Sequence, residues 1–126
     1  MNLNHLTIPS LDLEQSVEFY QTLDLKLIVR ALPHYVRFEC PDKDSTFSIR
    51  HVEELPDGNG VWLYFEVQDV DQTIENLLKK GIYIEEMPED KSWLWKEAKL
   101  RDPDGNQIII YHAGENRKNP PWRISD

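Results

Sequence analysis

Hydrophobic and polar positions follow the same plan twice along the chain. In each half, an alternating segment typical of a strand is followed by a segment with helical spacing and then by three further strand-like segments. The first half predicts a strand at 3–8, a helix from Asp12 to about Leu23, and strands at 25–31, 35–40 and 46–52. The second half predicts a strand at 61–67, a helix at 70–80, and strands at 82–86, 95–101 and 107–112. Each half is therefore predicted to be a βαβββ module.

A direct sequence repeat indicates that the two modules are equivalent. Residues 12–18, DLEQSVE, are matched position by position by residues 69–75, DVDQTIE. Two repeats are too few for an open solenoid, so the pair predicts one closed α+β domain with pseudo-twofold symmetry. We expect modules at about 1–56 and 60–112 that form a cupped mixed sheet with the helices outside, followed by a C-terminal arm at 113–126.

Composition narrows the class of protein. A chain of 126 residues that is 40% hydrophobic is long enough for one domain with a real core. The net charge of −9 argues against a nucleic-acid partner, since phosphate binding depends on clustered Lys and Arg. The single cysteine, Cys40, and the lack of a long apolar run predict a cytoplasmic protein that neither enters nor crosses a membrane.

Three local motifs, together with the paired modules, resemble one known family. They are the opening Asn4-His5-Leu6-Thr7-Ile8, the helix sequence DLEQSVEFY and the hairpin Asp102-Pro103-Asp104-Gly105-Asn106. This combination resembles the vicinal oxygen chelate superfamily, which includes glyoxalase I, extradiol dioxygenases, fosfomycin resistance enzymes and bleomycin resistance proteins. The resemblance covers about residues 3–112 and implies a small-molecule site on the cupped face of the sheet.

The resemblance also implies four metal-ligand positions, which are His5, Ser48, Trp62 and Ile109 in this chain. Of these four residues, only His5 commonly binds a metal ion, because Ser is a poor ligand for Zn, Ni, Fe or Mn and the side chains of Trp and Ile offer no basic lone pair. We therefore predict a divergent member that binds its ligand without a metal or other cofactor. The alternative is an unusual divalent-metal site, or a metal-free acid and base pair, formed by His5 with Glu66; Glu39 and Glu97 are further carboxylates that strand alternation could turn inward.

Strand alternation places the candidate ligand-binding residues on the same face as His5. They are His5, Ser48, Arg50, Trp62, Tyr64, Glu66, Ile109 and Tyr111. The aromatic residues would form walls, and His5, Arg50 and Glu66 would orient a ligand. Each has a structural interpretation as well: His5 as a hydrogen-bonded strand residue, the aromatic rings as core, and Arg37 and Arg50 as partners of carboxylates. An arginine without such a partner would attract an anionic ligand.

Several functions remain open at this stage. The first is a homodimeric protein that binds a small organic ligand in the sheet cavity without a metal. The alternatives are a metal-dependent lyase, isomerase or dioxygenase with an unusual site around His5, a drug-sequestering resistance protein, and an interaction module with no ligand. Outside the site, we interpret the acidic run 85–90 as a solvated loop, and we expect the tryptophans of 91–96 and the Pro-Pro-Trp arm to meet the domain or a second protomer.

Overall fold

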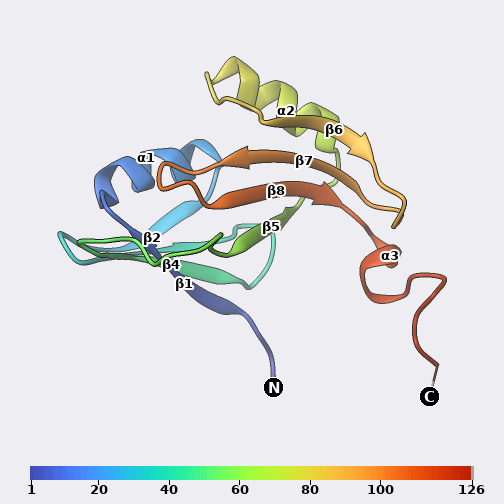
Figure 1. Cartoon of the computed structure of the whole chain (residues 1–126), viewed down its shortest axis with the longest axis horizontal. Helices are drawn as coiled ribbons and strands as arrows, with labels where there is room; N and C mark the ends of the chain where they lie inside the picture. Colours follow the sequence, from blue (N-terminus) through green and yellow to red (C-terminus); the bar gives the residue numbers. More distant parts are fainter. Residues whose placement is uncertain (126) are drawn as a thin grey trace. The chain divides into compact units, whose positions relative to one another are not determined.

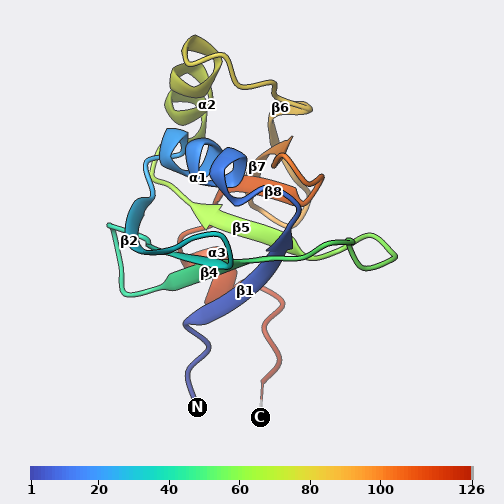
Figure 2. The same ribbon diagram turned by 90° about the vertical axis from the view of Figure 1, so that its left-hand side faces the viewer.

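The computed structural model describes residues 1–125, and these residues form two compact units (Figures 1 and 2). Unit 1 consists of Met1–Val61 together with the turn Asp102–Gly105. Unit 2 consists of Trp62–Arg101 and the chain from Asn106 onward. No helix in the described chain is long and apolar enough to cross a membrane.

Unit 1 is a four-stranded mixed sheet covered by one helix. Its elements are β1 (His5–Ser10), α1 (Leu13–Thr22), β2 (Lys26–Ala31), β3 (Tyr35–Glu39) and β4 (Thr46–His51), with strand order β1-β4-β3-β2. Strands β1 and β4 are parallel and the other pairs antiparallel. Asp12 caps α1 by accepting the Gln15 amide at 3.1 Å, which satisfies a backbone donor that has no partner within the helix.

The core of unit 1 lies between α1 and one face of its sheet. Alternate residues of β3 and β4 are buried there, among them Phe38 and Phe47, whose rings stack at 5.4 Å. Tyr20 of α1 packs edge-on against Phe47 at 4.9 Å. The period of two in a strand therefore leaves the other face of β3 and β4 for polar side chains.

Unit 2 repeats this plan. Its elements are β5 (Trp62–Glu66), α2 (Val70–Lys79), β6 (Glu86–Asp90), β7 (Lys96–Arg101), β8 (Gln107–His112) and a short helix α3 (Glu115–Lys118), with strand order β5-β8-β7-β6. Strands β5 and β8 are parallel, as are β1 and β4. Asp69 caps α2 through the Gln72 amide at 2.9 Å, and α2 packs on β6, β7 and β8. The predicted α+β class and the two βαβββ modules are confirmed.

One predicted strand was wrong. The segment 82–86 was predicted to be a strand and the acidic run 85–90 a loop, but the strand is Glu86–Asp90. Ile84 is buried instead of lying in a strand, and the acidic residues pair with the basic β7, where Lys99 lies 3.3 Å from Glu86. Since β6 is an edge strand, most of its charged side chains remain solvated, and such charges protect an exposed edge.

The turn between β7 and β8 is held against α1 by hydrogen bonds. Tyr20 donates its hydroxyl to Asp102 at 2.6 Å, and Asp104 accepts the Leu11 amide at 2.9 Å and the Ser16 hydroxyl at 3.2 Å. Burial, together with the neighbouring carboxylate of Asp102, raises the pKa of Tyr20 far above its ordinary value. In the repeat, Leu77 of α2 stands at the position of Tyr20, so the two helices are anchored by different forces.

The predicted arm at 113–126 begins with Gly114 and α3, and Asp126 lies outside the described residues. Trp95 donates its indole N–H to the carbonyl of Asn116 at 3.1 Å, so the start of the arm is attached to unit 2. The Trp122 side chain of Pro-Pro-Trp is 57% exposed.

Candidate functional site

His5 lies at the start of β1, where each nitrogen of its exposed ring contacts a hydroxyl group. Its Nδ1 is 2.7 Å from Thr46 Oγ1 and its Nε2 is 3.2 Å from Ser48 Oγ, while Thr7 Oγ1 is 2.7 Å from the same Ser48 oxygen. The parallel register of β1 and β4 sets these contacts, since it places His5 beside Thr46 and Thr7 beside Ser48. The structure thus brings His5 and Ser48 together, as alternation predicted.

The hydroxyl cluster continues onto β3. Arg37 Nε donates to Tyr35 Oη at 2.9 Å, and its guanidinium lies 5.4 Å from the centre of the Tyr35 ring. Partial burial alone would raise the pKa of Tyr35, but hydrogen bonds with Ser48 and Arg37 and the charge of Arg37 lower it below its ordinary value. The resulting polar face consists of His5, Thr7, Tyr35, Arg37, Glu39, Thr46, Ser48 and Arg50.

Arg50 lies at the edge of this polar face. It is paired directly across from Tyr35 in the antiparallel register of β3 and β4, and its side chain is exposed. A hollow of about 300 Å³ at this end of the strands is lined by His34, Tyr35, Arg50 and His51. Within residues 1–125, neither Arg37 nor Arg50 has a carboxylate partner.

The corresponding face of unit 2 is aromatic. Trp95 stacks on Tyr111 at 4.9 Å, and Tyr64 contacts Tyr111 at 5.5 Å and Trp95 at 6.0 Å. Ile109 is fully buried beneath this cluster, as expected of a residue that packs. Burial raises the pKa of both Tyr64 and Tyr111, so their hydroxyls are neutral groups.

Three further side chains lie on this aromatic face, which we define as Trp62, Tyr64, Glu66, Trp95, Glu97, Lys99, Ile109 and Tyr111. Trp62 is 56% exposed, and Lys99 Nζ lies 5.4 Å from its ring centre. Glu97 is buried and accepts the Trp93 indole N–H at 2.6 Å. The exposed ring of Trp62 and the half-exposed ring of Tyr64 offer surface on which a flat apolar group can pack.

Glu66 is occupied by the chain that follows β8. Its Oε2 accepts the amides of Ala113 at 2.8 Å and Gly114 at 2.9 Å, and Arg117 Nε lies 3.9 Å from Oε1. Partial burial alone would raise the pKa of Glu66, but the two amides and the positive charges nearby lower it below its ordinary value. A carboxyl group held in its ionised form in this way is a poor proton donor.

These surroundings do not fit the family's metal. Ser48 Oγ already contacts His5 Nε2 at 3.2 Å and Thr7 Oγ1 at 2.7 Å, which uses most of the hydrogen-bonding capacity of a hydroxyl. Both ring nitrogens of His5 contact hydroxyls, and Trp62 and Ile109 supply no ligand atom. Among residues 1–125, no three His, Cys, Asp or Glu side chains lie close enough to hold an ion together.

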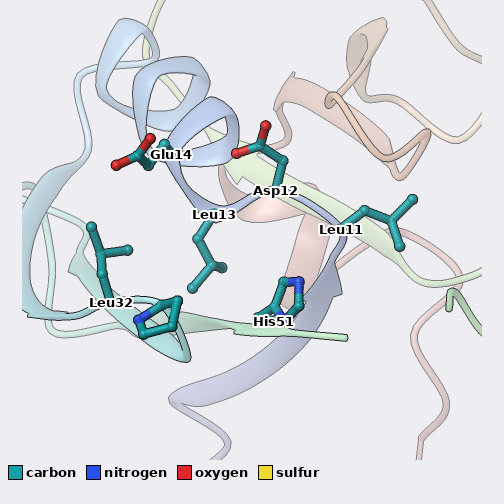
Figure 3. A pocket seen from close by; sticks show the side chains of 7 residues that line it. Leu11, Asp12, Leu13, Glu14, Leu32 and His51 are labelled. Atoms are coloured by element: carbon teal, nitrogen blue, oxygen red, sulfur yellow. The ribbon is translucent and has the colours of Figure 1, made fainter. Parts of the chain in front are cut away.

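A second hollow in unit 1 lies at the start of α1 and is distinct from the polar face. It measures about 280 Å³, and Figure 3 shows Asp12 and Glu14 on one side and Leu32 and His51 on the other. The carboxylate of Asp12 already accepts an amide of the helix, and His51 lies 3.9 Å from Glu53. The carboxylates of Asp12 and Glu14 give this hollow an acidic lining.

Tyr35 and Thr46 belong to the polar face but were not among the predicted residues. Alternation along β3 would place Tyr35 and Arg37 on one face, but only the β3–β4 register shows that this face also carries Ser48. That register depends on the turn between the strands, whose sequence does not fix its length. Of the predicted residues, His5, Ser48 and Arg50 belong to unit 1 and Trp62, Tyr64, Glu66, Ile109 and Tyr111 to unit 2.

Comparisons with known proteins agree with this fold. The family model described as Glyoxalase/Bleomycin resistance protein/Dioxygenase superfamily matches residues 2–110. A crystal structure of a glyoxalase/bleomycin resistance protein/dioxygenase from Nocardioides has a TM-score of 0.79 at 23% identity, covering 99% of this chain and 90% of that one. The bleomycin resistance determinant encoded on transposon Tn5 has a TM-score of 0.74 at 19% identity, covering 89% and 98%. At these identities the two structures establish the fold alone.

A protein of Bacillus subtilis (strain 168), named "Uncharacterized protein YraH", matches part of the sequence more closely. It is 48% identical over 50 residues, which is 39% of this chain and 39% of that protein. The aligned segment therefore spans less than half of either protein.

Proposed function

Because the chain belongs to the glyoxalase/bleomycin resistance protein/dioxygenase superfamily, we propose that it binds a small organic molecule on its sheet surface without a divalent metal ion. The observation that carries this proposal is the pair of hydroxyl contacts made by the His5 ring. Both imidazole nitrogens are engaged by Thr46 and Ser48, where a metal-binding relative would use the imidazole and a second ligand to hold an ion.

The polar face has the chemistry of a binding surface. It combines the hydroxyls of Tyr35, Ser48 and Thr46, the imidazole of His5 and the cations of Arg37 and Arg50, and groups of this kind orient a ligand by hydrogen bonds. On unit 2, the ring surfaces of Trp62 and Tyr64 are of the kind that packs an apolar group. Polar donors and aromatic surface are what recognition of a small organic molecule requires.

A thermal-shift screen of metabolites and antibiotics in buffer containing EDTA tests the proposal. A ligand that binds only the folded protein raises the Tm as its concentration increases. We expect at least one compound to do so with EDTA present and to have a smaller effect in Trp62→Ala, which removes an exposed ring of the proposed binding surface. Compounds that act only after Zn²⁺, Ni²⁺, Mn²⁺ or Fe²⁺ is supplied would contradict metal-free binding and favour the lyase, isomerase or dioxygenase alternative.

We also propose that the protein is a homodimer. In the described chain, β1 and β5 are edge strands that pair on one side only, and each carries an exposed apolar side chain, Leu6 on β1 and Trp62 on β5. Edges of this kind are natural places for a second protomer. Light scattering after gel filtration should give twice the chain mass of 14.9 kDa, and a mass of one chain at micromolar concentration would contradict the dimer.

A further inference from the structure

The strands of unit 1 carry an excess of positive charge in a strongly acidic protein. Strands β1–β4 contain Lys26, Arg30, Arg37 and Arg50 but a single carboxylate, Glu39, although the whole chain has a net charge of −9. Glu39 lies on the polar face opposite Thr46, and its carboxylate is 3.7 Å from Lys26. Arg37 and Arg50, on the polar face, are left without a carboxylate partner in residues 1–125.

The strand cations of unit 2 are arranged differently. Lys96 pairs with Asp71, Lys99 lies 3.3 Å from Glu86, and Arg101 donates to Glu85 at 2.8 Å. Each lysine or arginine of β7 therefore has a carboxylate partner. Among residues 1–125, Arg30 of unit 1 also lacks a carboxylate partner, but it pairs with Val36 and lies on the opposite face of the sheet, so Arg37 and Arg50 are the unpaired arginines of the polar face.

The register brings the two arginines to the same place. Tyr35 stands opposite Arg50, and Arg37 stands opposite Ser48, so Arg37 and Arg50 are diagonal neighbours on one face, a relation in which residues lie roughly 7–8 Å apart. Two positive charges on one face of a sheet repel each other, to an extent that solvent and salt reduce. An anion between the two guanidinium groups would relieve that repulsion.

The donors that remain suit an oxyanion. Arg37 uses Nε for the Tyr35 hydroxyl, so its two terminal nitrogens remain for a ligand, and the Arg50 side chain is exposed beside the hollow of about 300 Å³. A guanidinium group binds carboxylate or phosphate through two parallel hydrogen bonds, which a single point charge cannot do.

We propose that Arg37 and Arg50, on either side of Tyr35, bind the carboxylate or phosphate group of a small organic acid. This inference rests on the proposed function and specifies its ligand class. It also distinguishes the protein from one that sequesters a cationic drug, because two unpaired arginines would repel such a ligand.

Titrations followed by calorimetry and by NMR of the arginine Nε–H groups test the inference. The probes are phenyl phosphate, benzoate, neutral benzyl alcohol and inorganic phosphate, and the two organic anions distinguish a phosphate from a carboxylate ligand. We expect phenyl phosphate or benzoate to bind, to shift the Arg37 and Arg50 signals and to weaken with salt, while benzyl alcohol binds at least about tenfold more weakly.

Arg37→Gln and Arg50→Gln should each weaken binding about tenfold or more, since each removes a hydrogen-bonded charge. Arg50→Lys, which keeps the charge but loses the two-pronged geometry, should fall between the wild type and Arg50→Gln. Arg30→Gln is the matched control, because Arg30 pairs with Val36 and therefore lies on the opposite face of the same sheet. Equal losses in all three glutamine variants, or equal binding of benzoate and benzyl alcohol, would overturn the inference.

The outcomes separate this inference from the proposed function. If compounds bind in EDTA but their affinity is unchanged in Arg37→Gln and Arg50→Gln, the binding function stands and the anion site is wrong. If inorganic phosphate shifts the Arg37 and Arg50 signals while no organic compound binds, the anion site stands and the small-molecule function is wrong. No shift of either arginine signal with any anion contradicts the anion site directly.

Discussion

The two modules share one backbone plan but present different chemistry on equivalent faces. On the helix-facing side, the repeat keeps apolar residues at matching positions, as with Leu13 and Val70 or Val17 and Ile74. On the other side, Ser48 is replaced by Ile109 and His5 by Trp62. Core packing constrains the first set of positions and leaves the second free to change. The differences between the modules therefore lie on the surface where we propose that a ligand binds.

This difference also explains why the family's metal chemistry does not fit the chain. A four-ligand site draws two residues from each module, and here unit 1 has become a hydroxyl and arginine surface while unit 2 has become an aromatic one. The polar face and the aromatic face each satisfy their own buried groups. Neither leaves a set of free carboxylate and imidazole atoms for an ion.

The largest expected effects come from the anchors of the two helices, Leu77 in α2 and Tyr20 in α1. Leu77→Ala should lower the free energy of unfolding by about 2–5 kcal/mol because it leaves a cavity. Tyr20→Phe should lower it by about 1.5–3 kcal/mol because it removes a hydrogen bond to the Asp102 carboxylate. Urea unfolding measures both changes, with Tyr83→Phe as a control since Tyr83 is 80% exposed. If Tyr20→Phe left the free energy of unfolding unchanged, the hydrogen bond to Asp102 would not anchor α1.

The aromatic face offers a second comparison, between two tryptophans of unit 2. Trp95→Ala should cost about 2 kcal/mol, because it removes the stacking on Tyr111 and the hydrogen bond to Asn116. Trp62→Ala, at an exposed ring, should cost about 1 kcal/mol or less. Unfolding curves measure the difference, and near-ultraviolet circular dichroism should change most for Trp95. Equal costs would contradict the assignment of Trp95 to packing and of Trp62 to exposed surface.

The smallest expected effect concerns Glu66, whose lowered pKa reports its two amide partners. A carboxyl group whose pKa is lower in the folded than in the unfolded protein stabilises the fold at pH values above its unfolded pKa, which is roughly 4.3 for Glu. This stabilisation is lost as the pH falls through the pKa of the folded state. The amide proton shift of Gly114 should therefore titrate with a midpoint below roughly 4.3 in the wild type and lose this titration in Glu66→Gln. A midpoint at or above that value would contradict the contacts seen here.

Much of the fold could be predicted because the positions of the apolar residues reveal both the repeat and the alternation of the strands. The same alternation placed Ser48 beside His5, and the structure brings them to 3.2 Å. The acidic strand Glu86–Asp90 was missed because its charges resemble a loop, and only pairing with the basic β7 makes it a strand. Glu66 was predicted to orient a ligand, yet its carboxylate binds the amides of Ala113 and Gly114, a contact that depends on how the chain turns after β8.

Elemental analysis of the tag-free protein after incubation with Zn²⁺, Ni²⁺, Mn²⁺ and Fe²⁺ and removal of excess ions tests the central claim most directly. The hydroxyl contacts of both His5 ring nitrogens predict far less than one ion per chain for each metal, with no difference between the wild type, His5→Ala and the control His34→Ala. One tightly bound ion per chain that is retained in His34→Ala and lost in His5→Ala would contradict it.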